Sequence, residues 1–319
     1  MMKLDPENEA IIFDVQGFSV HDGPGSRTLV FFKGCPLQCY WCCNPESLKM
    51  HREIMYRRSK CDKCHACIDR KICPYDAISA EGPDSYITID RSKCLTCEEM
   101  PCVTGCYHDA LGVAGQVYTL DELVRRIERD ARYWGDGGGV TVGGGEIAMQ
   151  YRFVANFLRR LHEQGIHTAV ESSSMGNWAH LKKIYENVDW AFNDLKHMDP
   201  DKHKWATGKS NRKILENIAH IAELAALGEL RQIIRVPVVV GFNDDPGNID
   251  ATVEFVKSIG AKEINILPFH RLGESKYEQL DEVYDARDLC PPTDEHMNDI
   301  ADHIRAAGLA CYVGSQTPF

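Results

Sequence analysis

The segment Gly34-Cys-Pro-Leu-Gln-Cys-Tyr-Trp-Cys-Cys-Asn-Pro45 directly follows an apolar run, Thr28-Leu-Val-Phe-Phe32, that is typical of a buried strand. Within this loop, Cys35, Cys39 and Cys42 have the spacing C-x3-C-x2-C. A [4Fe–4S] cluster takes four ligands, so three thiolates from one loop leave one iron free for a substrate. Cys43 is left out, because adjacent residues on a tight loop cannot easily bind the same cluster. The alternative is a zinc loop with a remote fourth ligand.

The whole chain is acidic and rich in cysteine. Its 319 residues carry a formal net charge of -11 and 14 cysteines, twelve of which fall between residues 35 and 106. The first ten residues are acidic and polar, unlike a signal peptide, and the apolar runs fall short of the roughly 20 residues of a membrane span. We therefore expect a cytoplasmic monomer that binds neither membranes nor nucleic acid. In a reducing compartment, clustered cysteines indicate metal ligands rather than disulfides.

Strand and helix patterns alternate from about residue 117 onward. Apolar runs predict strands at 140–142, 167–170, 188–192, 232–236, 263–267 and 310–313. Amphipathic patterns predict helices near 120–133, 149–164, 177–186, 211–226, 247–259 and 294–307. This alternation predicts an α/β fold with a parallel sheet and crossover helices, and six or more such units favour a closed or partly closed barrel. Active residues then belong at the C-terminal ends of the strands.

Residues 52–112 precede this alternating region and differ from it. They contain short apolar pieces, turn residues and two cysteine runs. The runs read Cys61-x2-Cys64-x2-Cys67-x5-Cys73 and Cys94-x2-Cys97-x4-Cys102-x3-Cys106. The zone looks too small and irregular for a core of its own, so bound metal would have to hold it together. We accordingly divide the chain into a core, residues 1–51 and 113–319, and an insert, residues 52–112.

The residues around the first loop resemble a known family. Trp41 fills the aromatic position of C-x3-C-x-aromatic-C, the signature of the radical S-adenosylmethionine (SAM) superfamily. Asp22-Gly-Pro-Gly-Ser-Arg-Thr28 and Cys42-Cys-Asn-Pro-Glu46 resemble the D-G-P-G-x-R and C-x-N-P-E segments of its glycyl-radical-enzyme activating enzymes. The resemblance spans nearly the whole chain. It implies a partial TIM-like (β/α)6 radical SAM barrel with an inserted ferredoxin-like two-cluster domain.

The resemblance also implies a reaction and its partners. In the family, SAM chelates the free iron, an electron cleaves its sulfonium bond, and the 5′-deoxyadenosyl radical takes a hydrogen atom. The hydrogen comes from a glycine of a glycyl radical enzyme, here expected to be of the arylacetate decarboxylase, isethionate sulfite-lyase or choline lyase type. Asp22, Gly23, Pro24 and Gly25 are expected to face that glycine segment. A flavodoxin or ferredoxin is expected to donate the electron.

The expected SAM-binding residues lie in the cysteine loop and at successive strand ends. Glu146, in a G-G-E segment, is expected to accept hydrogen bonds from the methionyl ammonium. Lys196 is expected to reach the methionyl carboxylate. The alternatives are a solvated turn glutamate and a strand-end lysine whose stem packs on apolar surface. The full set implied by the resemblance is Trp41, Gly144, Gly145, Glu146, Glu171, Ser172, Asp194, Lys196 and His270.

The resemblance also implies a monovalent-cation site and a histidine contact to the ligand. Glu171 and Asp194 would help to form a monovalent-cation site, although Ser172 and Ser174 depart from the family's E/D-T-x-G pattern. His270 would lie near the adenosyl group, whereas a lone histidine is more often an ordinary polar residue. The cation site and the histidine contact are therefore implied by the resemblance alone.

The two cysteine runs of the insert resemble a bacterial two-cluster ferredoxin, in which the fourth cysteine of each run binds the other cluster. Carried over, one [4Fe–4S] cluster takes Cys61, Cys64, Cys67 and Cys106, and the other takes Cys94, Cys97, Cys102 and Cys73. With the cluster of the first loop, the chain would hold three. Two structural zinc ions are the alternative. The insert would either relay electrons or bind the partner.

Two other functions compete with the activating-enzyme interpretation. A radical SAM enzyme acting on a small molecule would share the cofactor site, but it would have no use for the Asp22–Gly25 segment. A ferredoxin-like electron-transfer protein would need only the insert, and the remaining α/β region of roughly 200 residues argues against it.

Overall fold

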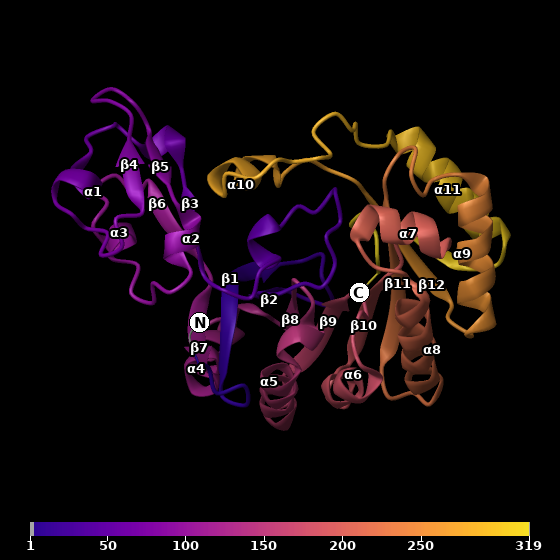
Figure 1. Cartoon of the computed structure of the whole chain (residues 1–319). Coiled ribbons are helices and arrows are strands. Elements are labelled where there is room, and N and C mark those ends of the chain that lie inside the picture. Colours follow the sequence, from indigo (N-terminus) through magenta and orange to yellow (C-terminus); the bar gives the residue numbers. More distant parts are fainter. Residues whose placement is uncertain (1–2, 319) are drawn as a thin grey trace.

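Figure 1 presents the computed structural model of the chain, which describes residues 3–318. Within that range the largest sheet has nine strands, in the order β13-β12-β11-β10-β9-β8-β2-β1-β7. No helix of the described residues is both long enough and apolar enough to cross a bilayer. The strands of this sheet are β1 (Glu9–Ser19), β2 (Arg27–Phe32), β7 (Gln116–Thr119), β8 (Gly139–Gly144), β9 (His167–Ser172), β10 (Trp190–Asp194), β11 (Arg231–Val238), β12 (Glu263–Pro268) and β13 (Ala310–Val313).

β2 and the strands β8 through β13 form the parallel part of the sheet, as the alternation of strand and helix predicts. β1 adds to β2 in the antiparallel direction, and β7 adds to β1 in the same way. Register places Val140 of β8 opposite Thr28 of β2 and opposite Thr168 of β9. Because parallel strands end at the same edge, the loops that follow β2 and β8 through β12 meet at one place.

Helices follow the strands at nearly all of the predicted positions. In Figure 1, α5, α6 and α8 lie below the strands, whereas α7, α10 and the cysteine loop lie above them. The helix predicted over 120–133 ends at Glu128 and is followed by a short 3₁₀ turn, Ala131–Tyr133. The helices of the α/β region are α4 (Leu120–Glu128), α5 (Tyr151–Glu163), α6 (Trp178–Tyr185), α7 (Pro200–Thr207), α8 (Arg212–Ala226), α9 (Pro246–Ser258), α10 (Glu274–Gln279) and α11 (Asp294–Ala306).

Local sequence explains where several of these helices begin. Thr119 and Glu122 form a capping box at α4, in which the Glu122 carboxylate accepts from the Thr119 N–H at 2.9 Å. α7 starts at Pro200, and the Asp199 carboxylate before it accepts from the Asp201 N–H at 2.8 Å. α7 and α10 are additions to the predicted elements, because their sequences are polar and lack a clear apolar stripe.

The core lies between the sheet and its helices in two main apolar clusters. One joins β8 to α5, where Val140, Val142 and Phe157 are fully buried. The other joins β11 and β12 to α9 and α11, with Ile234 and Ile264 at its centre. Burial of strand side chains on both faces explains why these strands are continuous apolar runs rather than alternating ones.

The insert has two small antiparallel sheets and three helices of one turn each. Its elements are β3 (Glu53–Tyr56), β4 (Ile78–Ala80), β5 (Ile87–Ile89), β6 (Leu111–Ala114), α1 (Ala66–Asp69), α2 (Arg91–Cys94) and α3 (Pro101–Thr104). β3 pairs with β6, and β4 pairs with β5. Ile54, Tyr56, Ile78, Ile87 and Leu111 form a buried apolar cluster there. The expectation that this zone has no core of its own was wrong, because residues from both sheets converge only when the chain folds back.

Candidate active site

A cavity of about 480 Å³ opens at the C-terminal ends of the parallel strands. The cysteine loop after β2 forms one wall, and the ends of β8, β9, β10, β11 and β12 form the others. Twelve of the residues predicted from the sequence line this cavity together. They are Asp22, Cys35, Cys39, Trp41, Cys42, Gly144, Gly145, Glu171, Ser172, Asp194, Lys196 and His270.

The three-cysteine loop is held by backbone hydrogen bonds to its surroundings. The Cys35 N–H donates to the Leu48 carbonyl at 3.0 Å, and the Cys42 N–H donates to the Cys39 carbonyl at 2.9 Å, which forms a turn. The Gln38 N–H donates to the Thr207 carbonyl at the end of α7, at 2.8 Å. These bonds fix the loop while the three sulfur-bearing side chains face one cavity.

The thiols of this loop suit a metal that supplies positive charge. Burial raises the pKa of Cys35 to about 12 and places the pKa of Cys42 well above its ordinary value. Thiols in such surroundings stay neutral unless a cation stabilises the thiolates. The donor set of three sulfurs on one wall therefore fits a metal cluster rather than a reactive cysteine nucleophile.

Aromatic rings support the loop on the side away from the strands. Trp41 is 7% exposed and lies 5.2 Å from Phe242 between ring centroids. Tyr40 packs edge-on against Trp41 at 4.9 Å and tilts against Trp205 at 5.5 Å. Trp41 is thus both part of the cavity wall and the contact that fixes the loop to α7 and to the segment after β11.

The glycines after β8 let two loops approach each other closely. Gly144 has φ of +108°, which L side chains rarely adopt. The Gly145 N–H donates to the Phe32 carbonyl at 2.9 Å, and the Glu146 N–H donates to the Gly34 carbonyl at 2.7 Å. The loop after β8 therefore lies directly against the start of the cysteine loop, with no room for a side chain.

Replacing Gly145 by alanine should destabilise the protein by about 1–3 kcal/mol, the usual cost of overpacking. A Cβ there would lie 2.3 Å from the Gly34 carbonyl oxygen and 3.1 Å from that of Ser47, and backbone atoms cannot move aside easily. Denaturant unfolding of the apoprotein measures the loss. Gly82→Ala is the control, because a Cβ at Gly82 has nothing within 4 Å. Equal stability of the two variants would contradict the close approach.

Glu146 contacts the end of β9 rather than lining the cavity. It is fully buried among the described residues and lies outside the cavity lining. Its carboxylate accepts from the Ser172 hydroxyl at 2.7 Å, from the Ser173 N–H at 2.9 Å and from the Ser173 hydroxyl. In this structure the carboxylate therefore ties the loop after β8 to the end of β9. Burial raises the pKa of Glu146 above its ordinary value, and hydrogen bonds from Ser173 and Ser172 oppose that shift.

A lysine–aspartate pair forms the floor of the cavity at the end of β10. The Lys196 Nζ lies 2.7 Å from the Asp194 Oδ2, and Lys196 is 8% exposed. Burial alone would lower the pKa of Lys196, but the Asp194 carboxylate and the sulfurs of Cys39 and Cys35 together raise the pKa above its ordinary value. The ammonium is therefore charged at neutral pH and available to an anionic ligand in the cavity.

Arg235 of β11 also lines the cavity, although the stretch Arg235-Val-Pro237 was expected only to be a strand end and Arg235 had no predicted role. Its guanidinium pairs with the Glu171 carboxylate and lies 3.7 Å from the Asp22 Oδ1. Burial raises the pKa of Glu171 to about 8, although the Arg235 guanidinium opposes the shift. The available signal was a charged residue in the middle of the apolar run 232–236, which in a buried strand needs a partner.

These pairs bear on the expected cation site. Glu171 and Asp194 are close to the same cavity, as the resemblance implies. Each carboxylate, however, already contacts a cationic side chain, Arg235 for Glu171 and Lys196 for Asp194. His270 is exposed at the rim of the cavity, and Ser172 lies at its wall with its hydroxyl directed to Glu146.

The segment Asp22–Gly25 lies beside the cavity and is clamped by Arg27. Arg27 is fully buried and donates to the Pro24 carbonyl at 2.9 Å and to the Val140 carbonyl at 2.7 Å. Cβ atoms at Gly23 and Gly25 would come within 2.8 Å of Arg27 and 2.6 Å of Gly138. Of the four segment residues only Asp22 lines the cavity, while Gly25 is exposed. The segment thus forms a partly exposed turn, in which Gly23 is buried, Gly25 is exposed and the Asp22 carboxylate lines the cavity.

The eight cysteines of the insert gather in two separate pockets. One is lined by Cys61, Cys64, Cys67 and Cys106, and the other by Cys73, Cys94, Cys97 and Cys102. This is the crosswise grouping that the ferredoxin-like spacing predicts, in which Cys73 and Cys106 exchange groups. Four sulfurs in each pocket, with mainly apolar side chains around them, fit a four-ligand metal centre.

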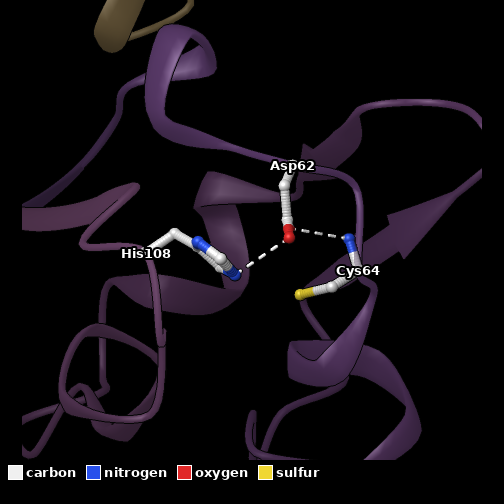
Figure 2. Close-up of side chains that lie close together, drawn as sticks. All are labelled: Asp62, Cys64 and His108. Carbon is white, nitrogen blue, oxygen red and sulfur yellow. Dashed lines mark hydrogen bonds and ion pairs between the residues drawn. The ribbon is translucent and has the colours of Figure 1, made fainter.

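A histidine and an aspartate lie at the rim of the first of these pockets. Figure 2 shows Asp62 between Cys64 and His108. The Asp62 carboxylate lies 2.9 Å from the His108 Nε2 and accepts from the Cys64 N–H at 3.1 Å. Ligand atoms of the three residues lie within 4.8 Å of one another, and all three residues are exposed. The carboxylate is already engaged on both sides, so we interpret Asp62 as support for the Cys64 backbone.

The segment around α10 connects the insert to the cysteine loop. The Lys276 Nζ lies 2.5 Å from the Glu46 Oε1, and the Tyr277 hydroxyl donates to the Cys42 carbonyl at 3.0 Å. On the insert side, Arg91 of α2 pairs with Asp281 at 2.9 Å. One segment after β12 therefore contacts both the predicted catalytic loop and the helix that carries Cys94.

Comparisons with known proteins identify a matching family and several relatives. Residues 97–256 match the family described as the radical SAM superfamily. The chain is 43% identical over 319 residues to the 4-hydroxyphenylacetate decarboxylase activating enzyme of Clostridioides difficile (strain CD196), with 100% of each chain covered. It is 40% identical to the indoleacetate decarboxylase activating enzyme of Tractidigestivibacter scatoligenes, covering 98% of this chain and 100% of that one. It is 38% identical to the isethionate sulfite-lyase activating enzyme of Nitratidesulfovibrio vulgaris, covering 87% and 89%.

Proposed function

Because the chain belongs to the radical SAM superfamily, and within it to the activating enzymes of glycyl radical enzymes, we propose the following course of its reaction. The protein binds SAM in the cavity at the strand ends and uses it to take a hydrogen atom from a glycine of a partner enzyme. The observation that carries this proposal is the shared cavity. Three cysteines of one loop, an ammonium group and the glycine turn all line it.

Cys35, Cys39 and Cys42 would hold a [4Fe–4S] cluster with one open position. When bound there, SAM supplies the chemistry, since its reduced sulfonium splits into methionine and a carbon radical. The chain's own residues bind and orient it. Trp41 and the glycines at 144 and 145 shape the wall, and the Lys196 ammonium offers a charged hydrogen bond to a carboxylate. His270, at the rim, would contact the adenosyl end.

Glu171 and Asp194 would act through the cations they already contact. The guanidinium of Arg235 and the ammonium of Lys196 lie where the resemblance implies a monovalent cation. We propose that these side chains supply the positive charge at this place. Glu146, which hydrogen-bonds Ser172 and Ser173, would position the strand end rather than contact the ligand.

The insert would carry two further clusters in the crosswise arrangement. Their proposed ligands are Cys61, Cys64, Cys67 and Cys106 for one, and Cys94, Cys97, Cys102 and Cys73 for the other. The core would comprise residues 1–51 and 113–319 around a partial barrel, and the insert residues 52–112. Met1, Met2 and Phe319 lie outside the described residues. The two four-sulfur pockets support this division.

The partner would be a glycyl radical enzyme of the arylacetate decarboxylase or isethionate sulfite-lyase type. The relatives carry the names of activators for such enzymes. The partly exposed turn Asp22–Gly25 beside the cavity would receive the glycine-bearing segment. Asp22 would face it from the cavity wall, where Arg235 holds the carboxylate.

One anaerobic experiment tests the proposal. The protein is reconstituted with iron and sulfide, and its iron content should approach about 12 per chain, four for each cluster. Addition of dithionite and SAM should release 5′-deoxyadenosine. The candidate partners 4-hydroxyphenylacetate decarboxylase, indoleacetate decarboxylase and isethionate sulfite-lyase are then added in separate reactions. At least one of them should acquire a protein radical that EPR detects.

Each result separates the proposal from its rivals. An absence of 5′-deoxyadenosine would reject radical SAM chemistry. Release of 5′-deoxyadenosine without a protein radical in every candidate partner would favour an enzyme that acts on a small molecule. Iron near four per chain together with bound zinc would reassign the insert to structural zinc.

A further inference from the structure

The insert is electrically polarised along its length. Residues 57–71 contain six lysine and arginine side chains and two carboxylates. Residues 72–106 contain two lysine and arginine side chains and six carboxylates. The chain as a whole has a net charge of -11, so a local excess of positive charge stands out. The excess covers the segment that carries Cys61, Cys64 and Cys67, the greater part of the first four-sulfur pocket.

Of the six cations of this segment, Arg58 lies 3.9 Å from the Asp281 carboxylate, and Arg57 donates to the Asp109 carbonyl. The other four have no carboxylate partner among the described residues: Lys60, Lys63, Arg70 and Lys71. Lys63 lies 4.6 Å from the ring centre of Tyr86, and Arg70 lies 5.1 Å from that of Tyr107. Tyr107 itself is 70% exposed. We name these four cations and two tyrosines the basic face. Exposed tyrosine and arginine are enriched at protein interfaces, and the unpaired lysines add a positive potential that attracts an acidic partner.

Arg70 and Lys71 of the basic face follow α1 directly, at the end of the insert that is distant from the cavity-forming core. Lys60 lies nearer to the core, because it follows Arg58, which is 3.9 Å from Asp281 of the α10 segment. In Figure 1, α1, which carries Cys67, lies at the outer end, whereas α2 and β3 lie on the side of the core. α2 carries Cys94 and contacts the α10 segment through Arg91 and Asp281. Cys64 of the outer pocket is exposed, while Cys102 of the inner pocket is buried. The outer sulfur group is therefore the one that a second protein can approach closely.

We propose that the basic face docks a small acidic electron-carrier protein, and that electrons enter this protein at the outer cysteine group. The inference rests on the proposed function, which requires an electron from outside. In each encounter one electron leaves the carrier, which is oxidised, and enters this protein, which is reduced, and no proton or group is transferred. Unpaired cations attract an acidic carrier over a distance, and the tyrosines offer contact area without deep burial.

The affinity for a carrier tests the inference without turnover. The probe is an acidic flavodoxin, titrated anaerobically into the reconstituted protein at low and at physiological salt. Lys63→Glu combined with Arg70→Glu should weaken binding about tenfold or more at low salt, and salt should affect the residual binding less. Lys60→Glu combined with Lys71→Glu reports on the same face without altering either cation–tyrosine contact. The matched control is Lys182→Glu combined with Lys183→Glu, two exposed lysines of α6 with the same charge change, which should bind like the parent.

A carbodiimide cross-link gives a second readout, because it joins a lysine to a carboxylate only at contact. Peptide mapping should find the carrier's carboxylates on Lys60, Lys63 or Lys71. Cross-links mainly to other lysines, or equal affinity in both face variants and the parent, would overturn the inference. Cross-links from the same lysines to a glycyl radical enzyme instead would also overturn it, and would assign the insert to partner binding.

The ratio of carrier-driven to dithionite-driven release of 5′-deoxyadenosine distinguishes this inference from the proposed function. A loss of the parent's dithionite-driven release contradicts the function itself. A normal parent with a ratio that falls about tenfold in both face variants supports the basic face. A ratio that stays at the parent value in both face variants rejects it.

Discussion

Replacing Cys39 by alanine should abolish the release of 5′-deoxyadenosine. Cys39 lies in the middle of the three-sulfur loop, packed between the apolar core and the aromatic cluster around Trp41. With two sulfurs left, the loop can no longer hold a cluster with a single open position, so SAM has no iron to chelate. Iron content should fall by about four per chain while the insert keeps its share. Chromatographic assay of 5′-deoxyadenosine and iron analysis measure the two effects.

Two other cysteines serve as controls for this variant. Cys290→Ala removes an exposed thiol outside the described cavity lining and should retain both iron and activity. Cys43→Ala is a stricter control, because Cys43 is adjacent to Cys42 and lines the same cavity. It should keep the full iron content. If Cys43→Ala lost the iron and Cys39→Ala kept it, the assignment of ligands in this loop would be wrong.

Replacing Arg235 by methionine should lower the free energy of unfolding by about 3–5 kcal/mol, the usual cost of breaking a buried ion pair. The Arg235 side chain is 7% exposed and pairs with Glu171, with Asp22 close by. Without the guanidinium, two carboxylates would be left near each other with little solvent. Denaturant unfolding of the apoprotein gives the stability change. Release of 5′-deoxyadenosine should also fall, because Arg235 positions the cavity wall.

The same strand provides a matched control. Arg231 of β11 pairs with Glu263 through two contacts of 2.8 and 2.6 Å and covers the Trp190 ring, much as Arg235 covers Phe192. Its side chain is 33% exposed, so solvent can stabilise the carboxylate that remains. Arg231→Met should therefore cost only about 0–1 kcal/mol. Equal losses for the two variants would indicate that burial of the Arg235 pair does not matter.

Several parts of the site could be predicted because one short segment contains them. Cys35, Cys39 and Cys42 lie within eight residues of one loop, close enough in the chain to predict a shared ligand, and in the structure all three line one cavity. The strand runs that end at Gly144, Ser172 and Asp194 were also visible, since a parallel strand buried on both faces is a continuous apolar run. Because such strands end at one edge of a sheet, the sequence predicts that their end residues lie close together.

Other features depended on contacts between distant segments. The Glu146 carboxylate was expected in the cavity, but Ser172 and Ser173 surround it once β8 and β9 are paired. The ion pairs of Arg235 were not predicted, because its partners, Glu171 and Asp22, come from two other parts of the chain. The small core of the insert escaped notice for the same reason. Its apolar residues are scattered singly between turns and meet only when β3 pairs with β6 and β4 with β5.

The sequence by itself indicated the chemistry of this protein. The cysteine spacing, the aromatic residue between two of the cysteines and the succession of strands and helices along the chain are all local properties. Tertiary structure alone decided which charges meet. It paired Lys196 with Asp194 and Arg235 with Glu171, joined the Glu146 carboxylate to Ser172 and Ser173, and set α1, with Arg70 and Lys71 directly after it, at the outer end of the insert. The physical reason is that an ion pair or a surface patch depends on distances in space, and a linear pattern specifies those distances only within one strand, helix or loop.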